Sequence, residues 1–381
     1  MTGANRIGAV ALGLTVLVSI PALGACGGDD GGGPAAFTPA KPLPAEYGST
    51  VVRIPGRTAT DVAGAALLAT HAVEPPSGWI VVRRDKWQNA LIGAQFAAHP
   101  VGAALLPAEK DYFPSASYDM LLRLTPPGFP RGQGLETLIL DKVGQDILID
   151  LQDRELKFAL IGGGQNPAKL ANEAVPFRGG WAKKYSSDVV VASSEHVQYA
   201  LPAAAWSAYT GDSLAYVTSK GVPQPTIDML TLRKGVTLQT PNIYVVGPPS
   251  VIPDSVVAQL SAYGNVTRIA GPDATTTSIA FARFRDPSTG FGWGMKRGPV
   301  SVSLVNSNHW ANAIGAFAYS ANGPRAPLIV VPGRKKLPIE LVSYLRGMRS
   351  GEPSHGFVFG DERSISSEAL RQLDAVLNGR S

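Results

Sequence analysis

Three short polar segments in this chain each follow an apolar run, and each precedes a segment of helical composition. They read Arg83-Arg84-Asp85-Lys86, Ser193-Ser194-Glu195-His196 and Asn306-Ser307-Asn308-His309. In an open parallel sheet, ligands lie outside the carboxyl ends of the strands, which is where these segments are predicted to lie. Their chemistries differ, whereas three catalytic copies would be expected to keep one set of residues. The polar segments therefore favour binding over turnover.

The second polar segment could suggest a hydrolase, because it contains Ser194, Glu195 and His196 in succession. Adjacent residues in a loop rarely point at one another, and the sequence contains no Gly-x-Ser-x-Gly nucleophile elbow. We therefore predict no catalytic residue and a protein that is not an enzyme.

No metal or cofactor site is predicted either. The five histidines show neither i,i+4 pairing nor another spacing typical of metal ligands. Gly162-Gly163-Gly164 follows an apolar run and could cradle a phosphate at a helix N-terminus. A tight turn between a strand and a helix is the simpler interpretation of these glycines.

Three arginines are the principal candidates for binding an anion. Arg53, Arg178 and Arg268 lie in the similar segments VRIPG, PFRGG and TRIAG. A guanidinium group makes forked, permanently charged contacts to phosphate or carboxylate, and a polymer that meets three copies would gain by avidity. The alternative is that each arginine pairs with an internal carboxylate or caps a neighbouring helix. The first polar segment completes the predicted anion-binding set with Arg83, Arg84 and Lys86.

The elements that position these residues recur three times. The segments KWQNALIGAQFAA (86–98), HVQYALPAAAWSA (196–208) and HWANAIGAFAYSA (309–321) share one pattern, and their equivalent alanines lie 110 and 113 residues apart. Each segment lies between two short apolar runs. Apolar runs that alternate with helices predict parallel strands buried on both faces, so each unit is predicted to be α/β. The small residues of the repeated helix would let it lie close against its sheet.

The rest of each unit is predicted from weaker signals. A third strand ending in glycine is expected at FALIGGG (158–164), IYVVGPP (243–249) and GFVFGDE (356–362). The arginine segments are taken as the unit starts, which leaves the middle unit with a shortened first helix. They also leave the first unit with extra material at roughly 111–154. The predicted units are 49–177, 178–267 and 268–381.

The N-terminal residues have the composition of an export signal. Arg6 is the only charge before Cys26, an apolar run follows it, and Leu-Gly-Ala-Cys ends at the only cysteine of the chain. Residues 1–26 are therefore predicted to be a secretory signal. Leu-Gly-Ala-Cys resembles the lipobox of bacterial lipoproteins, which implies an acylated Cys26; an uncut signal anchor is the alternative. Residues 27–48, rich in glycine and proline, are predicted to be a flexible tether.

The overall composition limits the partners. Hydrophobic residues make up 45% of the 381 residues and charged residues 17%, and the net charge is +5. Such a mild excess favours an anionic partner, but it is too weak to indicate nucleic acid. A single cysteine excludes disulfides within one chain.

One region carries a family resemblance. The segment 245–284, VVGPPSVIPDSVVAQLSAYGNVTRIAGPDATTTSIAFARF, resembles the junction between units in the cell wall-binding repeat 2 family. The matching positions include Gly247, Gly264, Arg268, Gly271 and Asp273, and a weaker likeness extends over 48–379. The resemblance implies three Rossmann-like units about a pseudo-threefold axis and non-covalent attachment to anionic polymers of a Gram-positive cell wall. The aspartate that the family places in the repeated helix is Asn89, Tyr199 and Asn312 here.

We therefore expect an α/β protein of three tandem Rossmann-like units, anchored by lipid at the outer face of the cytoplasmic membrane. Its expected partner is cell-wall glycopolymer or peptidoglycan, with no cofactor and no nucleic acid. Three alternatives remain open. The chain could be a scaffold that docks another envelope protein, a solute-binding lipoprotein of a transporter, or an envelope hydrolase.

Overall fold

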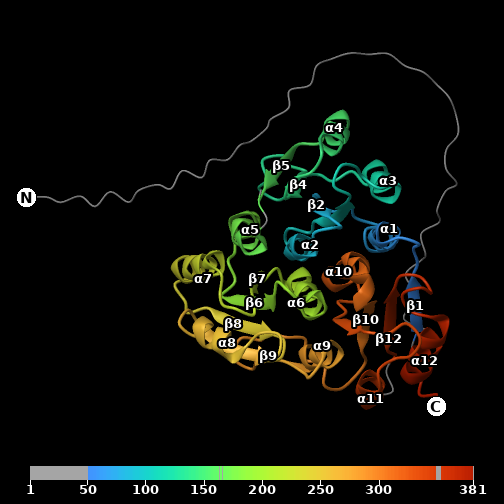
Figure 1. Cartoon of the computed structure of the whole chain (residues 1–381). Helices are drawn as coiled ribbons and strands as arrows, with labels where there is room; N and C mark the ends of the chain where they lie inside the picture. The colour runs from blue at the N-terminus through green and yellow to red at the C-terminus, as the bar shows by residue number, and fades with distance from the viewer. Residues whose placement is uncertain (1–49, 163, 165, 349–352, 381) are drawn as a thin grey trace, which may run out of the picture.

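The computed structural model describes residues 50–162, 164, 166–348 and 353–380. They form three four-stranded sheets, and every strand pairing in them is parallel. Figure 1 shows the sheets arranged around one centre, with helices between and outside them. The predicted fold class, α/β in three units with parallel sheets, is confirmed.

The first sheet has the strand order β3-β2-β4-β5. Its strands are β2 (Trp79–Arg83), β3 (Ala104–Ala108), β4 (Thr137–Leu140) and β5 (Phe158–Ile161). The helices associated with it are α1 (Ala59–Thr70), α2 (Trp87–Gly93), η1 (Ala94–Phe96), α3 (Ser115–Arg123) and α4 (Gln145–Asp153).

The second sheet has the order β7-β6-β8-β9. Its strands are β6 (Asp188–Ser193), β7 (Ser213–Val217), β8 (Asn242–Val246) and β9 (Asn265–Ile269). The associated helices are α5 (Pro167–Ala182), α6 (Val197–Thr210), α7 (Gln224–Thr237) and α8 (Asp254–Leu260).

The third sheet has the order β1-β12-β10-β11 and joins the two ends of the chain. Its strands are β1 (Thr50–Ile54), β10 (Ser301–Asn306), β11 (Leu328–Val331) and β12 (His355–Phe359). The associated helices are α9 (Ala274–Arg283), η2 (Ser307–Asn312), α10 (Ala313–Ala321), α11 (Ile339–Gly347) and α12 (Ser367–Leu377).

The thrice-repeated segments form α2, α6 and α10, which lie together at the centre of the molecule (Figure 1). Their glycines lie close to neighbouring elements. A Cβ atom on Gly93 would lie 3.0 Å from Val82 Cγ1, and one on Gly315 would lie 3.1 Å from Ala66 Cβ. These separations are tighter than ordinary van der Waals contact, so the small residues serve close packing. The repeat is therefore explained by the shared core that the three units build.

The third strand of the first unit was predicted at the wrong segment. FALI forms β5, which lies at the edge of its sheet, and the true third strand is β4, with the sequence TLIL. The segment predicted as extra material, 111–154, thus contains α3, β4 and α4, which have counterparts in both other units. The error arose because three apolar residues between turns gave only a short signal.

The predicted start of the second unit was also wrong. PFRGG is not a strand but part of α5, a helix of 16 residues that precedes β6. The middle unit therefore keeps a full first helix. The predicted division at 267/268 falls inside β9, which pairs with β8 and completes the second sheet.

The first strand belongs to the third unit rather than the first. β1 pairs in parallel with β12, with Val52 opposite Phe357 and Ile54 opposite Phe359. The structure therefore corrects the predicted range 49–177 at its N-terminal end. β1 occupies in the third sheet the place that β5 and β9 occupy in the other two.

Burial of His71 makes one pH effect expected. His71 ends α1 and is buried, and this burial lowers the pKa of its imidazole, opposed in part by a hydrogen bond with the Glu74 carbonyl. Below the ordinary histidine pKa of about 6.5, the unfolded chain takes up a proton that the folded chain resists, so stability falls as pH falls. We expect a lower urea midpoint at about pH 5 than at about pH 7, and a smaller difference in His71→Gln. The exposed His309 provides the control, because His309→Gln should keep the pH dependence of the wild type.

Candidate functional site

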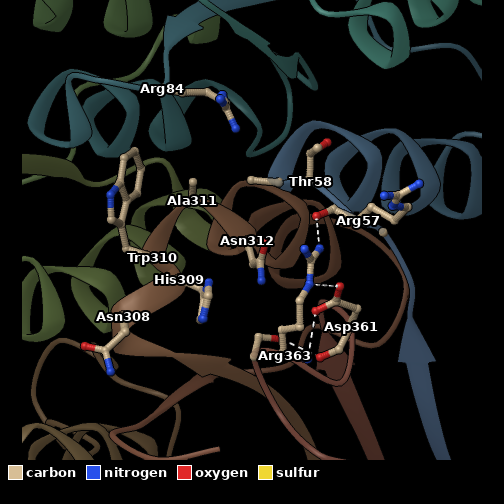
Figure 2. Close-up of a pocket in the computed structure, with 13 residues that line it drawn as sticks. Arg57, Thr58, Arg84, Asn308, His309, Trp310, Ala311, Asn312, Asp361 and Arg363 are labelled. Atoms are coloured by element: carbon tan, nitrogen blue, oxygen red, sulfur yellow. Dashed lines mark hydrogen bonds and ion pairs between the residues drawn. The ribbon is translucent and has the colours of Figure 1, made fainter.

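An open pocket lies where the third unit meets the first, at the carboxyl ends of β1, β10 and β12 (Figure 2). Its volume is about 340 Å³. Arg57, Arg363, His309 and Trp310 reach it from the third sheet's loops and the start of α1, and Arg84 reaches it from the end of β2. We call these five residues the junction pocket. Of the thirteen residues that line the hollow, three are arginines and one, Asp361, is a carboxylate, so the chemistry that the pocket suits is contact with an anion.

The start of α1 forms one wall of the junction pocket. Thr58 caps the helix: its hydroxyl accepts from the Asp61 amide at 3.2 Å, and its own amide donates to Asp61 Oδ2 at 2.9 Å. This reciprocal pair is a capping box, and it fixes the path of the chain just before the helix. Arg57, the residue before the cap, is therefore held at the rim with an exposed side chain.

Arg363 is held in place by its own loop. Its Nε donates to Asp361 Oδ2 at 2.6 Å, and its Nη2 donates to the Arg57 carbonyl oxygen, as the dashed lines in Figure 2 show. Partial burial alone would raise the pKa of Asp361, but hydrogen bonds from the Arg363 side chain and backbone outweigh it and lower the pKa. Asp361 therefore stays ionised at neutral pH and orients the guanidinium.

The remaining walls come from η2 and from the first unit. Arg84 Nε donates to Glu109 Oε1 at 2.7 Å, which anchors this side chain from the opposite unit. His309 and Asn308 are exposed, and Trp310 is partly buried. Beneath them, the buried Asn312 amide donates to the Phe359 carbonyl oxygen at 3.3 Å.

Two of the three predicted arginines occupy equivalent places and make the same internal contacts. Arg53 Nη1 and Nη2 donate to the carbonyl oxygens of Gly360 and Ile365, both at 2.8 Å. Arg268 donates in the same way to the carbonyl oxygens of Gly247 and Ile252, at 2.7 and 2.9 Å. These contacts tie the edge strand to the loop after its neighbouring strand.

The two arginines differ in their surroundings. Arg268 also pairs with Asp254 at 2.9 Å, and burial lowers the pKa of Arg53 while Glu362 and Asp361 oppose that effect. Their hydrogen bonds match the alternative interpretation of these residues, in which they hold the unit together. Their predicted contact with an anion stays a prediction.

Arg178 does not occupy the matching place. In the first sheet the position equivalent to Arg53 and Arg268 is occupied by Leu160 of β5, whereas Arg178 lies in α5 and is 6% exposed. Its guanidinium donates to the carbonyl oxygens of Gln95 at 2.9 Å and His99 at 3.1 Å, across the boundary between units. The prediction that Arg178 meets a polymer is wrong, because the side chain is enclosed.

The remaining residues predicted to bind an anion or to carry the lipid differ in their exposure to solvent. Arg83 is buried and donates to Asp85 Oδ1 at 2.9 Å and to the Lys142 carbonyl oxygen at 3.1 Å. Lys86 precedes α2 and is partly exposed. Cys26 lies outside the described residues, as do the predicted signal segment 1–26 and tether 27–48.

Arg57 and Arg363 were missed by the sequence reasoning. Arg57 directly precedes a helix cap and follows the glycine of VRIPG, so it lies at a strand-to-helix turn near the carboxyl end of a sheet. That position was a usable signal. Arg363 offered none, because its place depends on β12 lying beside a strand from the other end of the chain.

The residues that suggested a hydrolase do not form a catalytic arrangement. The Ser194 hydroxyl donates to the Val217 carbonyl oxygen at 3.3 Å, Glu195 Oε2 accepts from the Ser219 amide at 2.8 Å, and the His196 ring packs edge-on against Tyr199. Each of the three side chains thus engages a different neighbour.

Two further findings concern only the residues that the structure describes. They contain no group of three or more histidine, cysteine, aspartate or glutamate side chains placed to hold a metal ion. Among their helices, none has the length and apolar character needed to cross a bilayer. The glycine run 162–164 is described only in part, because Gly163 lies outside these ranges.

Comparison with known proteins shows the fold. No family model matches the chain, and no curated protein matches it. Among solved structures, Cwp6 from Clostridium difficile is similar with a TM-score of 0.70 at 15% identity, over 89% of this chain and 50% of that one. Cwp8 from Clostridium difficile is similar with a TM-score of 0.66 at 15% identity, over 87% and 52%. This chain spans about half the length of both, and they share its three-unit α/β fold.

Proposed function

We propose that this protein is a non-catalytic component of a bacterial cell envelope that binds an anionic cell-wall polymer. The observation that carries the proposal is the junction pocket, an open hollow lined by three arginines at the carboxyl ends of parallel strands. Ligands of open α/β sheets are met at these ends. Guanidinium groups suit the phosphate or carboxylate groups of acidic glycopolymers.

Two other lines support the same function. The sequence resembles the cell wall-binding repeat 2 family over its last unit junction, and the three-unit fold is shared with Cwp6 and Cwp8 of Clostridium difficile. The three equivalent polar segments carry different side chains, which is unlike a repeated catalytic site. Placement outside the cytoplasm, with a lipid anchor at Cys26, is part of the proposal and rests on the sequence of residues 1–26.

Sedimentation with purified wall material tests the proposal. The protein is expected to pellet with Gram-positive walls at low salt and to be released as salt rises, because contacts between exposed charges are screened. Walls stripped of their acidic glycopolymer should retain much less protein. A protein that stays in the supernatant with intact walls at every salt concentration would refute polymer binding.

Turnover assays separate the proposed function from its enzymatic alternative. We expect no release of soluble fragments from peptidoglycan or from acidic glycopolymer after long incubation. Fragment release by the wild type would overturn the non-catalytic part of the proposal, even if wall binding were observed.

A further inference from the structure

The three junctions of this triplicated fold are not chemically equivalent. The residues that immediately precede the caps of α1, α5 and α9 are Arg57, Gln165 and Pro272. The residues that follow β2, β6 and β10 are Arg84, Ser194 and Ser307. At both positions the arginine stands only where the third unit meets the first.

A third position adds to the same asymmetry. Arg363 lies in the loop between β12 and α12, three residues after Gly360. The residue three after the matching Gly247 in the second unit is Ser250. In the first unit the corresponding loop, Asp141-Lys142-Val143-Gly144, contains no arginine. Three arginines therefore converge on one junction, and neither of the other two junctions has a counterpart at these positions.

The charges of the junction pocket do not cancel. Arg84 is paired with Glu109, and Arg363 is paired with Asp361. Arg57 is exposed and, among the described residues, has no carboxylate partner. The pocket thus keeps one unneutralised guanidinium beside two that are already oriented, at the N-terminal end of a 12-residue helix whose dipole also favours an anion.

The shape of the pocket suits more than a bare ion. About 340 Å³ is within the range of small-ligand pockets. Figure 2 shows Trp310 and Arg57 on opposite sides of the hollow, with Arg363 between them and Arg84 at the end formed by the first unit. The flat indole of Trp310 offers an apolar wall against which a sugar ring can lie, while the arginines face its charged substituent.

We propose that the junction pocket, and neither of the two equivalent junctions, holds one phosphate or carboxylate group of an anionic saccharide, with its sugar ring against Trp310. The inference rests on the proposed function and makes it specific: the polymer is bound at one asymmetric site instead of three repeated ones. Arg57 and Arg363 hold the anion, and Arg84 closes the site from the neighbouring unit.

Titration of the full chain with small probes tests the site. The probes are inorganic phosphate, glycerol 3-phosphate and glucuronate, added at millimolar concentrations while tryptophan fluorescence and amide chemical shifts are recorded. We expect saturable binding of at least one probe, with affinity lowered about tenfold or more in Arg57→Gln and in Arg363→Gln. Preference for glycerol 3-phosphate over glucuronate would assign a phosphate-bearing polymer, and the reverse preference a uronate-bearing one.

Matched variants control for charge and folding. Arg371→Gln removes another exposed arginine, from an ion pair on α12, and should bind the probes like the wild type. Trp310→Leu should weaken binding of glucuronate more than binding of inorganic phosphate or glycerol 3-phosphate, because only glucuronate has a sugar ring. Thermal unfolding confirms that each variant is folded, and Arg57→Gln is expected to be folded because its side chain is exposed.

The results of these experiments distinguish an error in the assigned site from an error in the proposed function. If Arg57→Gln binds the probes like the wild type, or if no probe binds the wild type, the site assignment is wrong. If walls retain Arg57→Gln and the wild type equally, the proposed function stands and the site is again wrong. If the probes bind in an Arg57-dependent way but walls retain no protein, the site is correct and the polymer partner is wrong.

Discussion

Replacing Arg178 with methionine is expected to lower the free energy of unfolding by about 3 kcal/mol or more. Arg178 is 6% exposed, and its guanidinium donates to the Gln95 and His99 carbonyl oxygens across the boundary between the first two units. Methionine keeps much of the apolar stem but leaves the buried Gln95 carbonyl and the partly buried His99 carbonyl without these donors. Each charge-assisted hydrogen bond of this kind contributes roughly 1.5–3 kcal/mol.

Urea unfolding followed by circular dichroism measures the effect of Arg178→Met. Burial lowers the pKa of Arg178 to about 10, opposed by the charge of Asp212, so the side chain is still charged at neutral pH and the loss should be the same at pH 6 and pH 8. Arg371→Met is the matched control, since its surface ion pair should contribute less than about 1 kcal/mol. Equal stability of the two variants would show that Arg178 does not hold the units together.

Deleting the chain through Gly56 is expected to destabilise the third unit by roughly 4 kcal/mol or more. The deletion removes β1, whose residues pair with five residues of β12, and it removes the nearly buried Ile54. It also removes both hydrogen bonds from Arg53 to the loop after β12. That loop carries Arg363, so the junction pocket should be lost as well.

A circular permutant tests whether the deletion destabilises the protein because β1 is missing from the third sheet or because the chain begins at a different residue. Residues 49–56 are moved to follow Ser381, which places β1 after α12, as β9 follows α8. In the second unit only the residues between Leu260 and Asn265 make this connection, so a similarly short link should suffice. The permutant is expected to regain the stability that the deletion loses, as read from urea midpoints. A permutant no more stable than the deletion would contradict the strand order of the third sheet.

Local patterns predicted the parts of this fold that depend on burial alone. The runs that became β2, β6 and β11 are almost continuously apolar, and all four residues from Val189 to Ala192 are fully buried. The repeated helices were equally visible, because alanine and glycine must recur wherever a helix packs tightly on its neighbours. Three parallel α/β units could therefore be predicted without any knowledge of contacts.

Strand partners could not be predicted in the same way. TLIL of β4 and FALI of β5 have similar apolar content, and only their hydrogen-bonding order shows which is central and which is at the edge. The segment PFRGG is similar in sequence to VRIPG and TRIAG, yet it lies within the helix α5. An arginine followed by glycine is compatible with a strand and with a helix, so a five-residue similarity did not determine the secondary structure.

The sequence by itself determined the three-unit α/β organisation, because the pattern of apolar residues that marks strands and helices is a local property of the chain. Only the tertiary structure decided which arginines are enclosed and which line an open pocket. Arg178 is enclosed by a neighbouring unit, whereas Arg57 and Arg363, 306 residues apart, come together because β1 pairs with β12. The physical reason is that side-chain exposure depends on distant partners, and no local pattern encodes where those partners lie.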